Sequence, residues 1–103
     1  MQSESDAALD GVFRALADVS RRGMIDRLSR GPASVSDLAE PLAMALPSVL
    51  KHLQVLESSG LVCSEKTGRV RTYRLQSQAL RRLERWVAQR SAFWHQRFDR
   101  LER

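Results

Sequence analysis

A chain of 103 residues is the length of one ordinary domain, and its apolar fraction of 43% is typical of a globular protein. No apolar run approaches the ~20 residues of a membrane-spanning helix, and the polar, acidic start does not resemble a secretory signal. The single cysteine, Cys63, excludes an internal disulfide framework. We therefore expect a single-domain cytoplasmic protein.

Charge is sorted along the chain. Residues 1–50 carry five Lys and Arg against seven Asp and Glu, whereas residues 51–103 carry twelve against five. The resulting net charge of +5 is concentrated in the second half, which favours a polyanionic partner such as nucleic acid or an anionic membrane surface. The charge alone does not exclude the alternative that these basic residues simply form the water-exposed faces of helices.

The first two helices are predicted from the spacing of apolar residues. Residues 1–5 are expected to form a flexible N-terminus, and from Asp6, a candidate N-cap, apolar side chains recur at helical spacing. Asp18 or Ser20 can cap a second helix, which the glycine-proline pair at 31–32 ends.

The third and fourth helices are predicted to be joined by a short turn. Ser34 or Ser36 can cap the short third helix. The fourth is expected over residues 46–59, because Pro47 is tolerated only in a first turn and Gly60 provides a left-handed stop. Its apolar residues step by three and four and predict one buried stripe of Leu46, Val49, Leu53 and Leu56.

After the fourth helix the pattern becomes alternating. Residues 61–66 and 69–75 each suit a strand, with a tight turn at 67–68. From residue 77 onward no proline or glycine interrupts a long helix with an apolar seam. The order α-α-α-α-β-β-α predicts a mainly α fold with a small β-hairpin, a winged helix-turn-helix, in which residues 6–103 form one domain.

Two elements of this fold are suited to binding double-stranded DNA. A helix enters the major groove when one side grips the core and the other presents small polar or basic groups. A basic hairpin tip can then reach neighbouring phosphates. The candidate DNA-binding residues are Ser48, Lys51, His52 and Gln54 on the fourth helix, and Lys66, Arg69 and Arg71 on the hairpin. For His52, local packing at the border of the exposed face is an equal alternative.

The apolar seam of the last helix predicts a homodimer, since the small domain cannot cover its whole length. The expected interface residues are Leu9, Val12 and Phe13 of the first helix, and Leu80, Leu83, Val87, Trp94, Phe98 and Leu101 of the last. A two-fold dimer would place two recognition helices about 34 Å apart, the spacing of a partly palindromic operator.

Four stretches carry a resemblance to a known family: residues 13–18, 35–39, 47–57 and 60–62. Together they resemble the ArsR/SmtB family of bacterial winged-helix repressors, and the run from Lys51 to Leu56 is the most specific part. The resemblance covers residues 8–103 and implies a homodimeric repressor of transcription. The end of the chain is similar to the branch that lacks metal-site residues, the SRPBCC-associated type.

The chain departs from the family pattern in several places. Ala45 stands where an N-cap serine is usual, and Leu50 takes a position that is commonly polar. Ser34 and Ser36 occupy the thiolate positions of the third-helix metal site, and the last helix offers only His95 where several histidines are needed. We therefore expect neither a metal nor another cofactor.

The sequence contains few residues that would suit an enzyme or a redox switch. No glycine-rich phosphate loop, paired carboxylates or Ser/His/Asp arrangement predicts an enzyme. Cys63 is expected to be an ordinary small residue of a strand. A redox role would need a second thiol, which only another subunit could supply. The sequence predicts a DNA-binding repressor of its own or a neighbouring operon, with any small-molecule effector left open. The alternative is a winged-helix module for protein interaction whose basic surface serves solubility.

Overall fold

The structure, a computed structural model, describes residues 4–102, and five helices and three strands lie within them. Their order is α1 (Glu4–Leu16), α2 (Val19–Leu28), β1 (Ala33–Ser34), α3 (Val35–Ala39), α4 (Leu46–Ser58), β2 (Val62–Thr67), β3 (Val70–Leu75) and α5 (Ser77–Glu102). The predicted mainly α winged helix-turn-helix fold is confirmed. None of the helices found within residues 4–102 is long and apolar enough to cross a membrane.

The first residues of α1 and α2 show which of the predicted N-caps are correct. α1 begins at Glu4, so Asp6 lies inside its first turn, where a carboxylate interacts favourably with the helix dipole, and is not the N-cap. Residues 4 and 5, predicted to belong to the flexible N-terminus, are part of α1, and residues 1–3 lie outside the described part of the chain. The N-cap of α2 is Asp18, whose side chain accepts a hydrogen bond from the backbone N–H of Arg21 at 3.0 Å.

A reciprocal capping box fixes the start of α3. The backbone N–H of Asp37 donates to Ser34 Oγ at 3.2 Å, and the N–H of Ser34 donates to Asp37 Oδ2 at 3.3 Å. The helix ends at Ala39; Glu40 is its C-cap with helical backbone, and Pro41 has no backbone N–H to continue the hydrogen bonds of the helix. Ser34 is therefore the cap among the two predicted candidates.

The buried side of α4 holds Val49, Leu53 and Leu56, as predicted. Leu46 is the exception: it is 53% exposed, because it is the first residue of the helix and lies beyond the reach of the core. Gly60 follows the helix with a φ of +81°, which confirms the predicted left-handed stop.

Replacing Ala45 by serine is expected to stabilise the protein. Ala45 occupies the N-cap of α4 with extended backbone (φ −64°, ψ 146°) and provides no capping side chain. A serine hydroxyl there should add about 1 kcal/mol to the free energy of unfolding. Thermal unfolding followed by circular dichroism should show a rise in Tm of about 4–8 °C. Ala43→Ser, in the preceding turn, should change Tm little, and an unchanged Tm for Ala45→Ser would contradict the cap.

The three strands form an antiparallel sheet in the order β1-β3-β2. β1 has two residues, too few for an alternating pattern, and was not predicted. The pairing of Thr67 with Val70 places the hairpin turn at Gly68 and Arg69, one residue later than predicted. Gly68 has a φ of +63° and stands first in this turn, as in type II′ hairpins.

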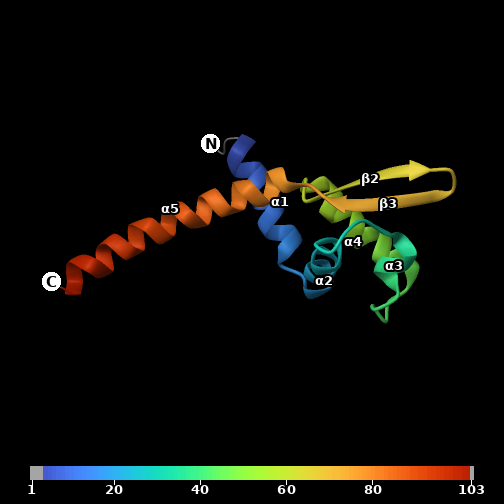
Figure 1. Ribbon diagram of the computed structural model, residues 1–103, viewed down its shortest axis with the longest axis horizontal. Helices are drawn as coiled ribbons and strands as arrows, with labels where there is room; N and C mark the ends of the chain where they lie inside the picture. Colours follow the sequence, from blue (N-terminus) through green and yellow to red (C-terminus); the bar gives the residue numbers. More distant parts are fainter. Residues whose placement is uncertain (1–3, 103) are drawn as a thin grey trace.

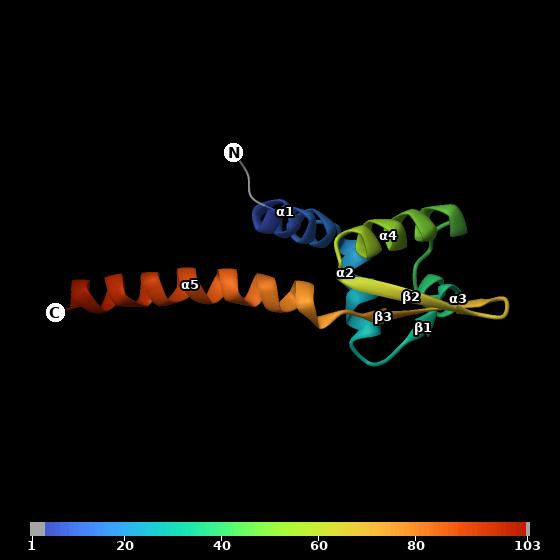
Figure 2. The same cartoon turned by 90° about the horizontal axis from the view of Figure 1, so that it is seen from above.

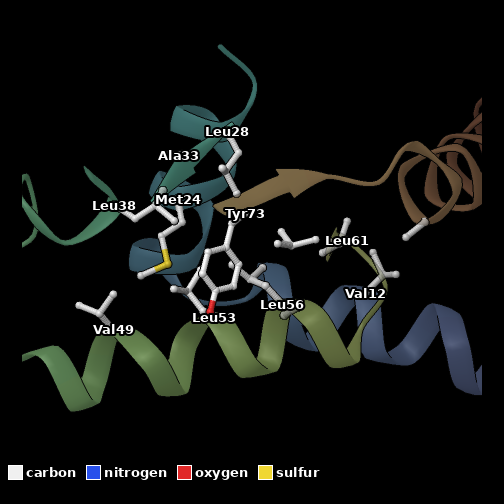
Figure 3. Close-up of a cluster of buried hydrophobic side chains, with 13 residues drawn as sticks. Val12, Met24, Leu28, Ala33, Leu38, Val49, Leu53, Leu56, Leu61 and Tyr73 are labelled. Atoms are coloured by element: carbon white, nitrogen blue, oxygen red, sulfur yellow. The ribbon is translucent and has the colours of Figure 1, made fainter. Parts of the chain in front are cut away.

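The core lies between α1, α2, α4 and the sheet (Figure 3), and α5 leaves it after its first turns. Among the described residues the buried apolar set is Val12, Ala15, Met24, Leu28, Ala33, Leu38, Val49, Leu53, Leu56, Leu61, Val62, Tyr73 and Ala79. Of α5, only Ala79 belongs to this set, with Leu80 and Leu83 packed against it. The rest of the helix extends to one side of the body (Figures 1 and 2), which gives the chain its length of 61 Å.

Candidate nucleic-acid interface

The exposed face of α4 carries the predicted polar residues. Since Val49, Leu53 and Leu56 are held in the core, the helical turn places Lys51 on the opposite side, with Ser48 and Gln54 beside it. All three side chains are exposed. α4 is therefore anchored on one side and presents polar and basic groups on the other.

The hairpin β2–β3 presents Lys66 and Arg71 on the same side as α4. Residues directly opposite each other in an antiparallel pair share one face, and Lys66 is paired with Arg71 just as Ser64 is paired with Tyr73. Tyr73 is buried in the core and its ring points toward α4 (Figure 3), so this face of the hairpin is the one that turns toward the helix. Arg69 lies at the exposed turn.

A chain of hydrogen bonds ties Arg71 to α4. Arg71 Nη1 donates to Ser64 Oγ at 2.9 Å, and Ser64 Oγ donates to Glu57 Oε1 at 3.2 Å. The guanidinium of Arg71 is thus held near the base of the hairpin, and Lys66 and Arg69 remain as its freely exposed cations. Sequence reasoning missed Glu57 and Ser64, since only the fold brings these positions together.

His52 is turned toward α2. Its Nδ1 lies 3.1 Å from Arg21 Nη1 and 3.8 Å from Asp18 Oδ2, and its side chain is only 19% exposed. Arg21 can only donate, so Nδ1 is the acceptor in this contact. The structure thus shows the predicted local packing of His52, and its contact with DNA stays a prediction.

Arg21 connects three helices. Its Nε donates to the carbonyl of Ala15 at 2.7 Å and its Nη2 to the carbonyl of Arg14 at 3.0 Å, both at the C-terminal end of α1. The third contact is the one to His52 on α4. The backbone N–H of Arg21 is also the main cause that lowers the pKa of the Asp18 carboxyl. Arg21 was not among the predicted site residues.

Cys63 lies on the other face of the hairpin. Its Sγ accepts a hydrogen bond from Arg74 Nε at 3.3 Å, and this bond is the main cause that lowers the pKa of the thiol. The side chain is half-buried in β2, as expected of a small strand residue.

The predicted dimer surface lies on α5 and α1. Val87, Trp94 and Phe98 are 47%, 57% and 56% exposed, and the rings of Trp94 and Phe98 are 6.1 Å apart. Leu80 and Leu83 are half-buried against the core. The side chain of Leu101 lies outside the described residues.

α1 supplies a smaller part of this surface than predicted. Phe13 is 40% exposed and meets Trp86 of α5 edge-on, with ring centroids 5.2 Å apart, and Leu9 is half-buried. Val12 as an interface residue is wrong, because its side chain is fully buried in the core of one chain and has no surface left for a partner.

The structure shows where two of the positions considered for metal ligands lie. Ser34 caps α3, and His95 stands exposed on α5. Within the part of the chain that the structure describes, no group of three or more His, Cys, Asp or Glu is arranged to hold a metal ion.

Comparison with known proteins agrees with this geometry. Residues 16–64 match the helix-turn-helix domain family. The chain is 42% identical over 66 residues to the HTH-type transcriptional regulator Rv2034 of Mycobacterium tuberculosis, a match covering 64% of this chain and 62% of that protein. The chain therefore spans less than two thirds of that relative's length.

Two solved structures are similar over most of their length. The crystal structure of an ArsR family transcriptional regulator has a TM-score of 0.83 and 45% identity, covering 92% of this chain and 97% of that one. A solution structure of the homodimeric winged helix-turn-helix DNA-binding domain of Mb0332 from Mycobacterium bovis, a possible ArsR-family regulator, has a TM-score of 0.67 and 28% identity, covering 91% and 93%.

An anchored helix with a polar outer face, next to a basic hairpin, defines a winged helix-turn-helix transcriptional regulator. At 45% identity over nearly the whole of a solved relative, the chain belongs to the ArsR family of these regulators.

Proposed function

We propose that this chain is a homodimeric, sequence-specific DNA-binding protein that represses its own or a neighbouring operon. The observation that carries the proposal is the common orientation of the two basic elements. The outer face of α4 and the Lys66 face of the hairpin point to one side of the domain, so one DNA duplex can meet both. In this arrangement α4 enters the major groove and the hairpin follows the adjacent backbone.

The residues divide into two roles. Ser48, Lys51 and Gln54 face the base edges, where their donors and acceptors can distinguish base pairs. Lys66 and Arg69 neutralise phosphates at the exposed end of the hairpin, and Arg71 does so nearer its base. His52 acts behind α4, where its bond to Arg21 holds the helix against α2.

Dimerisation supplies the second half-site. α5 has 26 residues, about 39 Å of helix, and the single chain leaves most of its apolar side uncovered. A second copy related by a two-fold axis covers both helices at once. The homodimeric state of the similar Mb0332 domain supports this proposal. A dimer of this kind binds a partly palindromic operator and blocks transcription by occupying it.

Two single substitutions separate base reading from phosphate binding. Gln54→Ala should weaken operator binding by about 1–3 kcal/mol and relax the base preference at one position of each half-site. Lys66→Ala should weaken binding to operator and unrelated DNA by the same factor. It should also lower the slope of log K against log salt by about 2, one phosphate for each subunit.

Fluorescence anisotropy over a series of salt concentrations measures both effects. Glu65→Gln is a matched control, because Glu65 is exposed next to Lys66 but points to the opposite face of β2. Variants that leave both the affinity and the salt slope of the parent unchanged would favour the protein-interaction module instead.

A further inference from the structure

The start of α4 is unusually apolar for a DNA-binding helix. Between Pro41 and Leu50 the sequence has one polar side chain, Ser48. Within this segment Val49 is buried, but Leu46 and Leu50 are 53% and 44% exposed, and the alanines at 43 and 45 are exposed as well. Neither leucine belongs to the core or packs against it.

The two leucines lie on one edge of α4, which faces the hairpin. They are four residues apart and therefore one turn apart on the same side of the helix. Glu57 continues this edge seven residues after Leu50, and its carboxylate accepts a hydrogen bond from Ser64 of β2. The edge thus borders the angle between α4 and the hairpin, next to the face of Lys51 and Gln54.

The chemistry of the major groove offers one apolar group that suits such an edge. The edges of guanine, adenine and cytosine present only donors and acceptors there, whereas thymine presents its C5-methyl group beside an acceptor. A polar base edge pressed against a leucine loses its hydrogen bonds to water without replacement, which disfavours cytosine at the same position.

We propose that Leu46 and Leu50 determine specificity by packing on thymine methyl groups in each operator half-site. This inference rests on the proposed function, since it requires α4 in the major groove. One helical turn separates the leucines by about 6 Å, so the two thymines lie within about two base steps of each other. At these two thymines the protein therefore selects its operator by contact with methyl groups rather than by hydrogen bonds.

Replacement of thymine by deoxyuridine tests the methyl contact alone, because it removes the C5-methyl and keeps every hydrogen-bonding group and phosphate. Each thymine of the operator is replaced in turn, symmetrically in both half-sites, and affinity is measured by fluorescence anisotropy. At the contacted positions the affinity of the parent protein should fall about 4-fold for each methyl group removed, from ~0.8 kcal/mol per buried carbon. Replacing the two equivalent thymines of both half-sites together should therefore lower the affinity about 15-fold.

Leu50→Ala should abolish the loss at one of these positions and keep the loss at the other, and Leu46→Ala should do the reverse. Because both leucines are exposed, the variants should fold normally, which thermal unfolding checks. Val70→Ala is the matched control: Val70 is an equally exposed apolar residue on the hairpin, and its removal should leave the deoxyuridine effect intact.

Four outcomes are decisive. Loss of affinity that disappears in the leucine variants supports the proposal. A protein that prefers its operator to scrambled DNA yet binds the deoxyuridine operator equally well overturns it, as does a deoxyuridine effect that survives both variants. A protein that does not prefer its operator at all refutes the proposed function itself.

Discussion

Replacing Trp94 with alanine is expected to weaken the homodimer by about 3–5 kcal/mol, because a large aromatic side chain is lost from the centre of the proposed α5 interface. In the single chain Trp94 is 57% exposed and contacts Phe98 on the same helix, so the substitution removes little that holds one chain together. Sedimentation velocity at micromolar concentration should therefore show a folded monomer for the variant and a dimer for the parent. Operator affinity should fall in parallel, since a monomer binds one half-site.

Val19→Ala is the control for this experiment. Val19 is 74% exposed at the start of α2, away from α5, and its truncation should leave the dimer intact. A Trp94→Ala variant that sediments like the parent would contradict the role of α5. A parent protein that is a stable monomer at micromolar concentration would remove the dimer from the proposal.

The second large effect is expected at Arg21. Arg21→Ala removes side-chain hydrogen bonds to the carbonyls of Arg14 and Ala15 and to His52, and takes away one of the cations at the end of α1. Hydrogen bonds to a charged group contribute about 1.5–3 kcal/mol, so the free energy of unfolding should fall by roughly 2–3 kcal/mol. Because α4 also loses its tie to α2, operator binding should weaken as well. Urea unfolding measures the first effect and fluorescence anisotropy the second.

The neighbouring Arg22 provides the comparison for Arg21. Its Nη1 donates to the carbonyl of Leu16 at 2.7 Å, and it contacts no residue of α4 by a hydrogen bond. Arg22→Ala should therefore cost roughly 1 kcal/mol of stability and leave operator affinity close to that of the parent. Equal effects of the two substitutions on DNA binding would show that Arg21 does not position α4.

Local signals in the sequence were enough to predict most elements of the fold. The periodic residues Val49, Leu53 and Leu56 defined the inner side of α4, and with it the exposed side that carries Lys51. Gly60 marked the end of that helix because its positive φ is a property of the residue itself. Such features depend on neighbours within one turn, which the sequence contains.

What the sequence could not provide depends on contacts between distant segments. β1 has two residues and exists because β3 lies beside it, so no pattern in its own residues announces it. The contact of His52 with Arg21 joins positions 31 residues apart, and no periodicity encodes such a pair.

Burial within one chain explains the error at Val12. Helical spacing placed Val12 on the apolar side of α1, but the sequence does not tell whether that side meets the chain's own core or a second subunit. Leu46 illustrates the opposite case. Its spacing fits the buried stripe, yet the core ends before it, and the side chain is left on the surface that we assign to DNA.

Binding to DNA from the promoter upstream of its own gene tests the central claim most directly. The affinity of the intact chain for this DNA is compared with that for a scrambled duplex of the same length at ~150 mM salt. The proposed dimeric repressor should bind the promoter at least about 10³-fold more tightly, the range of specific over non-specific binding. Equal affinity for the two duplexes would contradict sequence-specific recognition by α4 and the hairpin.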